Sequence, residues 1–337
     1  MKTISEYFII FFMKKLIIFL IALAALFFLF SFILFGGNLF EELSARSPIV
    51  TVLIATASLI AASFLFGLVT NDYSWVDRMW STAPIFFAWV YAAHGWFDVR
   101  LFVAAVLVTL WGARLTFNFA RKGGYTGVED YRWPVLQKKI TNPVLWQLFN
   151  FGFIAAFQIS MFVLFTLPLY RIYLNPGVPP STGFYITAFF FLFFLLWETI
   201  ADQQQWNFHK IKQSLKNGSL SSKLTDRQQA YAQDAEDGFL QSGLFRFSRH
   251  PNYFGELAIW WTFFIMGSLH AGAFLHWSLV GPVLLTILFF GSTRFTEAIS
   301  SEKYPAYAEF QRTTSAIIPW FPSSRPAQEE MIERPAE

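Results

Sequence analysis

Several runs of about 20 predominantly apolar residues divide this chain, and they constrain its fold more than any other feature. The hydrocarbon core of a bilayer is about 30 Å thick, which an α-helix crosses in about 20 residues. A membrane interior cannot hydrogen-bond exposed backbone groups, so runs of this length favour spanning helices. We therefore predict an all-α polytopic membrane helical bundle with about 7 to 8 transmembrane helices. The expected spans are residues 15–35, 49–69, 82–97, 100–120, 145–169, 184–206, 254–269 and 275–293.

The composition agrees with a membrane protein and excludes several kinds of site. Of 337 residues, 55% are hydrophobic, 20% are aromatic and only 14% are charged, against about 25% charged residues in soluble domains. The chain has no cysteine, which excludes disulfides, thiolate metal ligands and cysteine nucleophiles. We expect one integral membrane domain over residues 1–322 and a disordered tail over 323–337, where apolar residues are few.

The first apolar run resembles a signal peptide in one respect, because Lys14 and Lys15 precede it. It is, however, longer than the 7 to 15 apolar residues of a signal peptide, and no Ala-x-Ala cleavage pattern follows. We therefore expect a retained membrane anchor. The sequence leaves open whether translation starts at Met1 or Met13.

Basic residues are distributed unevenly between the segments that separate the spans. If the N-terminus is cytoplasmic, 21 of the 25 lysines and arginines fall on cytoplasmic segments and 3 fall on the opposite side. This asymmetry follows the positive-inside rule and predicts an even number of spans with both termini in the cytoplasm. Because membrane topology explains the net charge of +3, we expect no nucleic-acid partner.

Polar residues of the N-terminal half form two candidate groups. Asp77 and Arg78 lie in a tryptophan-rich loop between the second and third expected spans, although such loops also occur as purely structural features. Arg114, Asn118 and Arg121 are spaced to share one helix face. Arg121 can reach the membrane surface by snorkelling. Arg114 lies about two turns deeper, which predicts a buried carboxylate or anion as its partner.

Two acids end the long apolar run of the sixth expected span. Glu198 and Asp202 share a helix face with Gln205. Acids beside hydrocarbon require a partner. The sequence leaves two alternatives open: a bound ligand, or an ion pair with Arg114 or Arg249.

The segment from Gly243 to Glu256 has the highest density of polar groups beside a span. Arg246 and Arg249 suit phosphate groups because a guanidinium donates two parallel hydrogen bonds. The sequence contains no glycine-rich Rossmann or P-loop motif for those phosphates. His250 has no other histidine at metal-ligand spacing, so no metal site is expected.

Together these motifs carry a resemblance to a known family. The segment 243–256, the helix of Asp202 and the segment from Lys303-Tyr304-Pro305 to Ile318-Pro319-Trp320-Phe321 resemble the C-terminal region of the steroid 5-alpha-reductase superfamily. The patterns Trp111-Gly-x-Arg114-Leu115 and Glu129-Asp130-Tyr131-Arg132 make the match closest to its DUF1295 family. The resemblance covers roughly residues 70–322. Sterol reductases and isoprenylcysteine carboxyl methyltransferases are similar more distantly.

The resemblance implies NADPH, bound from the cytoplasmic side by a C-terminal region over residues 198–322. By motif, Asp202 matches the family aspartate before the cofactor loop, Asn252 and Glu256 match its Asn-x-x-Gly-Glu contacts, and Tyr304 matches the tyrosine of its Tyr-Pro segment. The complete set of expected cofactor-binding residues is Arg121, Glu198, Asp202, Arg246, Arg249, His250, Asn252, Tyr253, Glu256, Tyr304 and Tyr307.

The N-terminal half departs from the steroid-reductase pattern. The tyrosine that grips the substrate carbonyl in steroid reductases falls on Trp111, with Asp77 as a stand-in for the accompanying glutamate. An indole N–H can donate a hydrogen bond to an enolate but cannot protonate it. We therefore expect Asp77, together with Arg114 or Tyr131, at the carbonyl end of the substrate.

These observations predict an NADPH-dependent reductase of a conjugated carbon–carbon double bond in a lipophilic substrate, steroid-like or isoprenoid. It would lie among membrane lipid in a bacterial inner membrane. Two alternatives remain: a membrane methyltransferase that uses S-adenosylmethionine, and a non-enzymatic lipid carrier or transporter. The density of basic groups at the cytoplasmic edge favours NADPH, and the scarcity of polar groups at mid-membrane disfavours a transporter.

Overall fold

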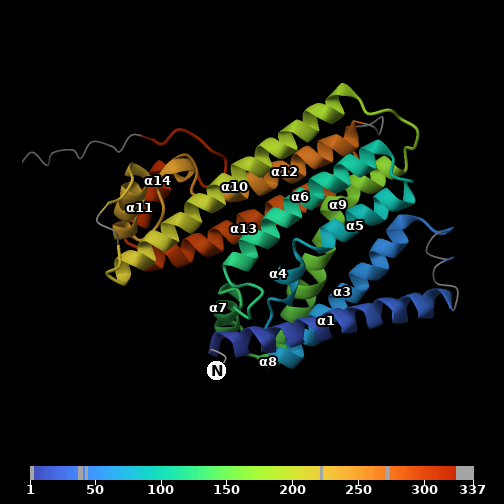
Figure 1. Cartoon of the computed structure of the whole chain (residues 1–337), viewed down its shortest axis with the longest axis horizontal. Helices are drawn as coiled ribbons and strands as arrows, with labels where there is room; N and C mark the ends of the chain where they lie inside the picture. The colour runs from blue at the N-terminus through green and yellow to red at the C-terminus, as the bar shows by residue number, and fades with distance from the viewer. Residues whose placement is uncertain (1–3, 37–40, 42–44, 221–222, 270–273, 324–337) are drawn as a thin grey trace, which may run out of the picture. The chain divides into compact units, whose positions relative to one another are not determined.

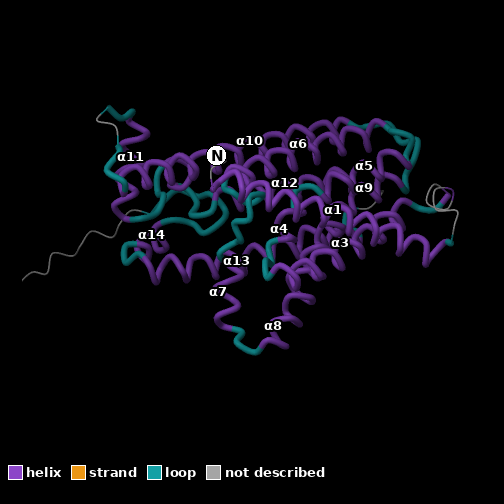
Figure 2. The backbone as a smooth tube through the Cα atoms, turned by 60° about the horizontal axis from the view of Figure 1, so that its bottom comes forward, coloured by secondary structure: helices purple, strands orange, loops and turns teal. Residues whose placement is uncertain are grey.

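The described part of the chain consists of helices joined by loops and turns, without a strand (Figures 1 and 2). A computed structural model describes residues 4–36, 41, 45–220, 223–269 and 274–323. The predicted disordered tail lies outside these residues except for Ser323. The longer helices are α1 (Ile4–Phe35), α3 (Pro48–Thr70), α5 (Ala83–His94), α6 (Val99–Arg121), α9 (Gln158–Tyr173), α10 (Thr182–Lys216), α11 (Asp226–Asp237), α12 (Pro251–Ser268) and α13 (Val280–Lys303). The shorter ones are α4 (Trp75–Met79), α7 (Arg132–Lys139), α8 (Pro143–Phe149), the π-helix η1 (Asn150–Phe157), the 3₁₀ helices η2 (Gly243–Arg246) and η3 (Trp277–Leu279), and α14 (Tyr307–Thr313).

Six helical segments of the described chain are long and apolar enough to cross a membrane. They are Lys14–Leu34, Pro48–Thr70, Val99–Arg121, Pro143–Tyr173, Thr182–Lys216 and Trp277–Lys303. The expected spans at 82–97 and 254–269 form shorter helices instead. With 12 residues, α5 is about 18 Å long, below the thickness of the hydrocarbon core. With 18 residues, α12 is about 27 Å long, and its first turns carry polar residues.

The chain divides into two compact units. Unit 1 comprises residues 1–192 and 260–285, and unit 2 comprises residues 193–259 and 286–337. The helices α10, α12 and α13 each contribute residues to both units.

Unit 1 has an apolar core with close helix contacts at small residues. On α6, a β-carbon at Gly112 would lie 2.4 Å from the carbonyl oxygen of Ser81, so the two segments approach too closely for any side chain there. Trp111 is fully buried, and its ring meets that of Trp260 edge-on at 4.9 Å. The position that departs from the steroid-reductase pattern therefore lies in packed aromatic core.

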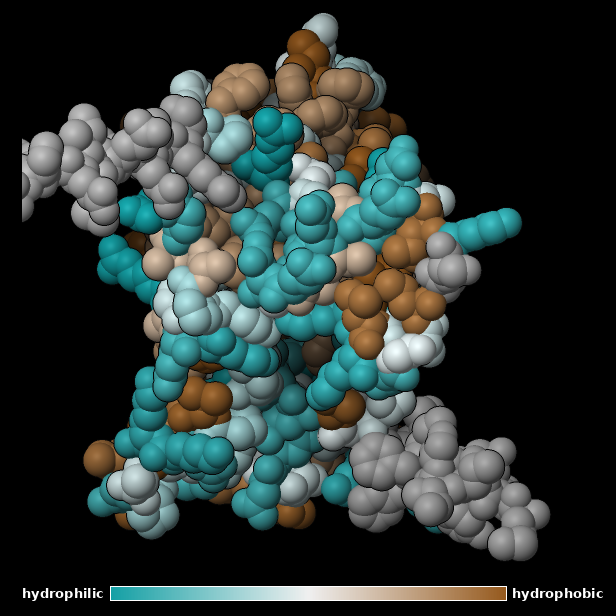
Figure 3. Space-filling view, turned by 90° about the vertical axis from the view of Figure 1, so that its left-hand side faces the viewer, coloured by the Kyte–Doolittle hydropathy of each residue, from teal (hydrophilic) through white to brown (hydrophobic). Residues whose placement is uncertain are grey.

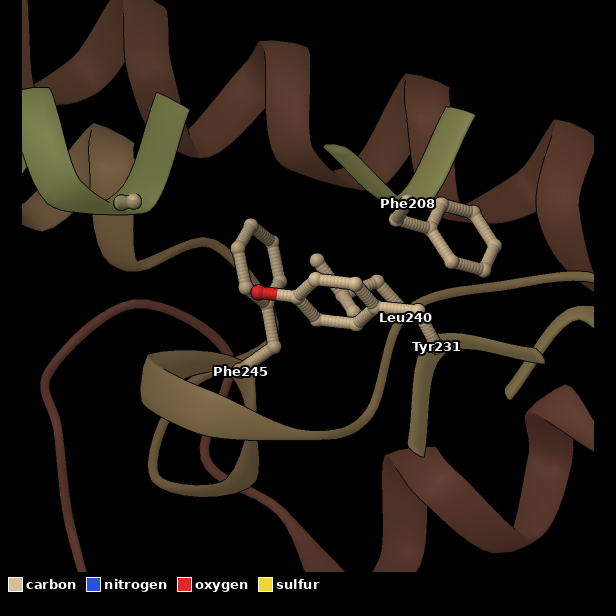
Figure 4. Close-up of a cluster of buried hydrophobic side chains, with 5 residues drawn as sticks. Phe208, Tyr231, Leu240 and Phe245 are labelled. Carbon is tan, nitrogen blue, oxygen red and sulfur yellow. The ribbon is translucent and has the colours of Figure 1, made fainter. Parts of the chain in front are cut away.

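Unit 2 is built around two small apolar clusters where its polar segments fold back on the long helices. In the first, the Tyr231 ring lies among Phe208, Leu240 and Phe245 (Figure 4). This cluster attaches α11 and the following loop to α10. In the second, Phe239 packs on Tyr307 and Phe310 of α14, with ring centroids 4.9 and 5.3 Å away. The two clusters anchor the connection between α11 and α12, in which the polar segment 243–256 begins.

Candidate functional site

In unit 2, the Glu297 carboxylate of α13 joins residues that are far apart in the sequence. Arg249 donates to both oxygens, from Nε at 2.7 Å and from a terminal nitrogen at 2.9 Å. His250 Nε2 lies 3.0 Å from one oxygen, and Gln311 Nε2 donates to the other at 3.0 Å. Both Arg249 and Glu297 have side chains that are 9% exposed. This bidentate pair therefore ties the segment before α12 to α13 and α14.

All three guanidinium nitrogens of Arg249 donate hydrogen bonds within unit 2. Its second terminal nitrogen donates to the carbonyl oxygens of Gln311, at 3.0 Å, and Thr314. The backbone N–H groups of Arg249 and His250 donate to the carbonyls of Ser315 and Ala316 at 2.8 and 3.0 Å. A phosphate at Arg249 would have to displace Glu297, so the geometry favours a structural role for this arginine. The predicted alternative of an ion pair between Arg249 and Glu198 or Asp202 is not formed.

Three buried acids of unit 2 lie on the helices α10 and α12. Glu198, Asp202 and Glu256 are 5%, 5% and 4% exposed. The helices pack closely, because a β-carbon at Gly255 would lie 2.7 Å from Glu198 Cβ. The Trp197 indole N–H also donates to the Pro251 carbonyl at 3.0 Å, which fixes the start of α12 against α10. These three predicted cofactor residues thus belong to one pair of packed helices.

The other predicted residues of the 243–256 segment differ in their exposure and contacts. Arg246, at the end of η2, is exposed and lines a cavity of about 190 Å³ with Gln241, Phe310, Thr313, Thr314, Pro322 and Ser323. Asn252 is partly buried in the first turn of α12. Tyr253 stacks on the His250 ring, with ring centroids 5.0 Å apart and an interplanar angle of 17°. Of the two arginines expected to bind phosphate, Arg246 is therefore the more accessible, because Arg249 is paired with Glu297.

The two predicted tyrosines of the C-terminal segment have different surroundings. Tyr307 is 5% exposed in the second apolar cluster, and burial raises its pKa above the ordinary value of 10.0. Tyr304 is partly buried, and its hydroxyl oxygen accepts a hydrogen bond from Lys212 Nζ at 3.0 Å. Burial alone would raise the pKa of Tyr304, but the hydrogen bond from Lys212 and the nearby positive charges of Lys212 and Lys303 lower it. The sequence analysis did not single out Lys212, because only folding brings it to Tyr304.

Hydrophilic residues cover much of the end of unit 2 at which α11 and α14 lie (Figure 3). Ten of the eleven predicted cofactor residues belong to unit 2, and Arg121 belongs to unit 1. All three residues predicted for the substrate carbonyl, Asp77, Arg114 and Tyr131, belong to unit 1. The two predicted halves of the site therefore fall in different compact units.

In unit 1, Asp77 is held by the first two residues of α7. Trp133 donates from its indole nitrogen to one carboxylate oxygen at 2.8 Å, and Arg132 donates to the other at 3.3 Å. Burial raises the pKa of Asp77 above its ordinary 3.8, although Arg132 and Trp133 oppose this shift. Neither Arg114 nor Tyr131 is a hydrogen-bond partner of Asp77. Sequence analysis missed Trp133, whose only signal is its place next to Arg132 in the Glu129–Arg132 pattern.

Arg78, next to Asp77, is 0% exposed. Its guanidinium donates to Asp72 at 2.7 Å and to the Gly124 carbonyl at 3.1 Å, and it lies 4.8 Å from the Trp75 ring. The Tyr125 hydroxyl in turn donates to the Arg78 carbonyl at 3.1 Å. This arginine joins the loop after α3 to the loop after α6.

The remaining predicted residues of unit 1 lie on or near α6. Arg121 Nε donates to Asn118 Oδ1 at 2.9 Å, which confirms that the two share a helix face. Arg114 is partly buried on the same helix. Tyr131 is 53% exposed, just before α7. The exposed position of Tyr131 makes it the weakest of the three carbonyl candidates.

Long apolar helices that carry buried ionisable residues define an all-α polytopic integral membrane protein. The family model described as "Protein of unknown function (DUF1295)" matches residues 63–314, and the chain belongs to this family. The chain is also 35% identical over 271 residues to an uncharacterized protein of Schizosaccharomyces pombe, covering 78% of this chain and 77% of that protein. No solved structure matches the chain. The predicted likeness to DUF1295 is thereby confirmed.

Proposed function

We propose that this protein is a membrane-embedded, NADPH-dependent reductase of a conjugated carbon–carbon double bond in a lipophilic substrate. Membership of the steroid 5-alpha-reductase superfamily and a cofactor site on the cytoplasmic face are parts of the same proposal. The observation that carries it is the placement of Glu198, Asp202 and Glu256, buried on two packed helices of unit 2. Ionisable residues inside membrane proteins are costly, and they usually mark functional sites.

The side chains of unit 2 fit the chemical groups of a dinucleotide. Carboxylates accept hydrogen bonds from ribose hydroxyls and from a carboxamide, as the acidic residue of Rossmann folds does. Phosphates need cationic donors, and unit 2 supplies Arg246, Lys212 and Lys303. The donor set of unit 2 therefore matches both the sugars and the phosphates of NADPH.

Unit 1 offers a candidate acid for the substrate carbonyl. NADPH supplies a hydride when bound. Burial favours the neutral form of Asp77, and a neutral carboxylic acid can donate a hydrogen bond to a carbonyl oxygen on which charge develops. Arg132, at 3.3 Å from the Asp77 carboxylate, would stabilise the same negative charge.

Ligand titration of the purified protein, read by thermal unfolding, tests the cofactor. NADPH at one hundred times its dissociation constant stabilises a folded protein by about 2.7 kcal/mol, since it binds only the folded state. We expect NADPH to raise the unfolding temperature and S-adenosylmethionine to leave it unchanged. The opposite result would favour the methyltransferase, whose substrate ammonium the same carboxylates could accept. If neither compound binds, the enzyme proposal fails and the lipid carrier gains support.

Two substitutions test whether unit 2 makes the contacts. Asn252→Ala and Glu256→Gln should each weaken NADPH binding about tenfold or more, the usual effect of losing a hydrogen bond to a ligand in a buried site. Gln213→Ala, on an exposed position of α10, is the matched control and should bind like the wild type. If both variants fold and bind NADPH normally, the cofactor site lies elsewhere.

A further inference from the structure

Two lysines converge on the phenol of Tyr304 in unit 2. Lys212 Nζ of α10 donates to the Tyr304 hydroxyl oxygen at 3.0 Å and lies 4.8 Å from the centre of its ring. Lys303, the last residue of α13, places its Nζ 5.2 Å from the same ring. Two positive charges thus lie beside a single neutral group.

Lys212 and Lys303 differ from Arg249 and Arg312 of the same unit in their charge balance. Arg249 pairs with Glu297, and Arg312 pairs with Glu309. Within the described residues, neither Lys212 nor Lys303 forms an ion pair with a carboxylate. Lys212 is partly buried, whereas Lys303 is exposed. The Lys212 ammonium therefore loses part of its solvation, and no carboxylate replaces it as a counter-charge. The site therefore has positive charge to offer an anion.

The donors at this place are only partly used. Lys212 gives two of its three hydrogens to the Gly238 carbonyl and the Tyr304 hydroxyl, which leaves one. Since the Tyr304 oxygen accepts from Lys212, its own hydrogen can be donated elsewhere. Lys303 adds a further ammonium. A phosphate group carries three strong acceptor oxygens, and lysine binds phosphate as a point charge.

The backbone is shaped to hold Tyr304 at this place. Gly238, at the C-terminal end of α11, has φ +92°, and a β-carbon there would lie 2.3 Å from Tyr304 Cε1. Only glycine avoids that overlap. The carbonyl of Gly238 also positions Lys212. The lowered pKa of Tyr304 agrees with the positive charge on its two sides, which outweighs the opposing effect of burial.

We propose that Lys212, Lys303 and Tyr304 form a binding site for a phosphate monoester. The inference rests on the proposed function only for the molecule that carries the phosphate, which could be the 2′-phosphate of NADPH or an anionic lipid headgroup. The site is distinct from Arg249, whose guanidinium is paired with Glu297.

Calorimetric titration of the purified protein with inorganic phosphate and with adenosine 2′,5′-bisphosphate tests the site. Lys303→Gln is the informative variant, because it removes one charge from an exposed side chain. We expect Lys303→Gln and Tyr304→Phe to weaken binding of adenosine 2′,5′-bisphosphate about tenfold, the effect of losing one charge-assisted hydrogen bond. Lys210→Gln is the control, because Lys210 is exposed on the same helix as Lys212 and contacts the Trp206 ring.

The source of the phosphate is decided by two further comparisons. If a nucleotide is the ligand, Lys303→Gln should weaken NADPH binding and leave NADH binding unchanged. If a lipid is the ligand, nanodiscs with phosphatidic acid should stabilise the wild type more than phosphatidylcholine nanodiscs, and Lys303→Gln should remove the difference. Either result supports the phosphate site.

The site is overturned if phosphate and the bisphosphate bind the wild type and all three variants equally, or do not bind the wild type. Normal NADPH binding in both the wild type and Lys303→Gln, together with no phosphatidic-acid effect that Lys303→Gln removes, would overturn this site and leave the reductase proposal standing. If the wild type binds the bisphosphate through Lys303 but fails to bind NADPH, the phosphate site is supported and the reductase proposal fails.

Discussion

The two compact units use their charged residues differently. In unit 1, three arginines pair with acids nearby in the fold: Arg78 with Asp72, Arg132 with Asp77 and Asp130, and Arg100 with Asp98. In unit 2, Arg249 likewise pairs with Glu297, but Lys212 and Lys303 both lie beside Tyr304 and have no carboxylate partner. An ion pair within the fold can stabilise a loop, whereas a positive charge without a carboxylate partner can attract an anion. The loop charges compared in unit 1 are thus balanced by carboxylates of the same unit, whereas two lysines of unit 2 lie together without a carboxylate.

The largest effect should come from the most buried charge of unit 1. Arg78→Met would leave Asp72 without its partner and the Gly124 carbonyl without its donor, so we expect a loss of about 3–5 kcal/mol of stability. Thermal unfolding in detergent measures it. Lys138→Met, in an exposed position of α7, is the control. A loss below about 1 kcal/mol, the range of a surface ion pair, would show that the Arg78 network is not structural.

A smaller loss should follow from neutralising the Glu297 carboxylate. Glu297→Gln keeps the shape but weakens the hydrogen bonds from Arg249, so we expect about 1.5–3 kcal/mol. Glu309→Gln, which alters an exposed pair with Arg312, is the control and should cost at most about 1 kcal/mol. If Glu297→Gln and Glu309→Gln cost the same stability, Arg249 would be as available to a ligand as an exposed arginine. The contrast in unit 2 between the paired Arg249 and the lysines without a carboxylate would then disappear.

Gly238→Ala should cost about 1–3 kcal/mol, because it adds a methyl group where the Tyr304 ring already lies and strains the backbone. Gly218→Ala provides the control. Gly218 also has a positive φ of +65° but nothing within 4 Å of its β-carbon position. The two variants share the backbone strain, so their difference isolates the contact with Tyr304. Only Gly238→Ala should also reduce phosphate binding, as read by the same calorimetric titration.

The smallest effect concerns the ionisation of the tyrosines. Since the folded-state pKa of Tyr304 is lowered from 10.0, its contribution to stability is fully present above pH 10 and is lost as pH falls through the lowered pKa. A spectrophotometric titration of wild type against Tyr304→Phe should show one tyrosine that ionises below pH 10. Tyr307→Phe is the control, because burial raises the pKa of Tyr307. Bound phosphate should raise the pKa of Tyr304, since it adds negative charge beside the phenol.

Sequence patterns predicted those features that depend on local chemistry. The length of the apolar runs predicted the six described helical segments that are long and apolar enough to span a membrane. The spacing of Asn118 and Arg121 predicted that they share a helix face. Local polarity was less informative about partners. Arg249 was expected to bind phosphate because guanidinium groups suit it, yet Glu297, 48 positions later, occupies its guanidinium. Asp77 was expected to act on the substrate carbonyl with Arg114 or Tyr131, and the sequence did not indicate that Trp133 and Arg132 donate hydrogen bonds to it.

The sequence by itself determined the all-α membrane class, because burial of backbone polar groups in hydrocarbon leaves an apolar run of about 20 residues no other structure. It also determined the DUF1295 family through its motifs. Only the tertiary structure decided which charges are paired and which remain available for a ligand. That distinction depends on distances between residues far apart in the chain, such as Lys212 and Tyr304, and these distances are set by packing of the helices rather than by local spacing.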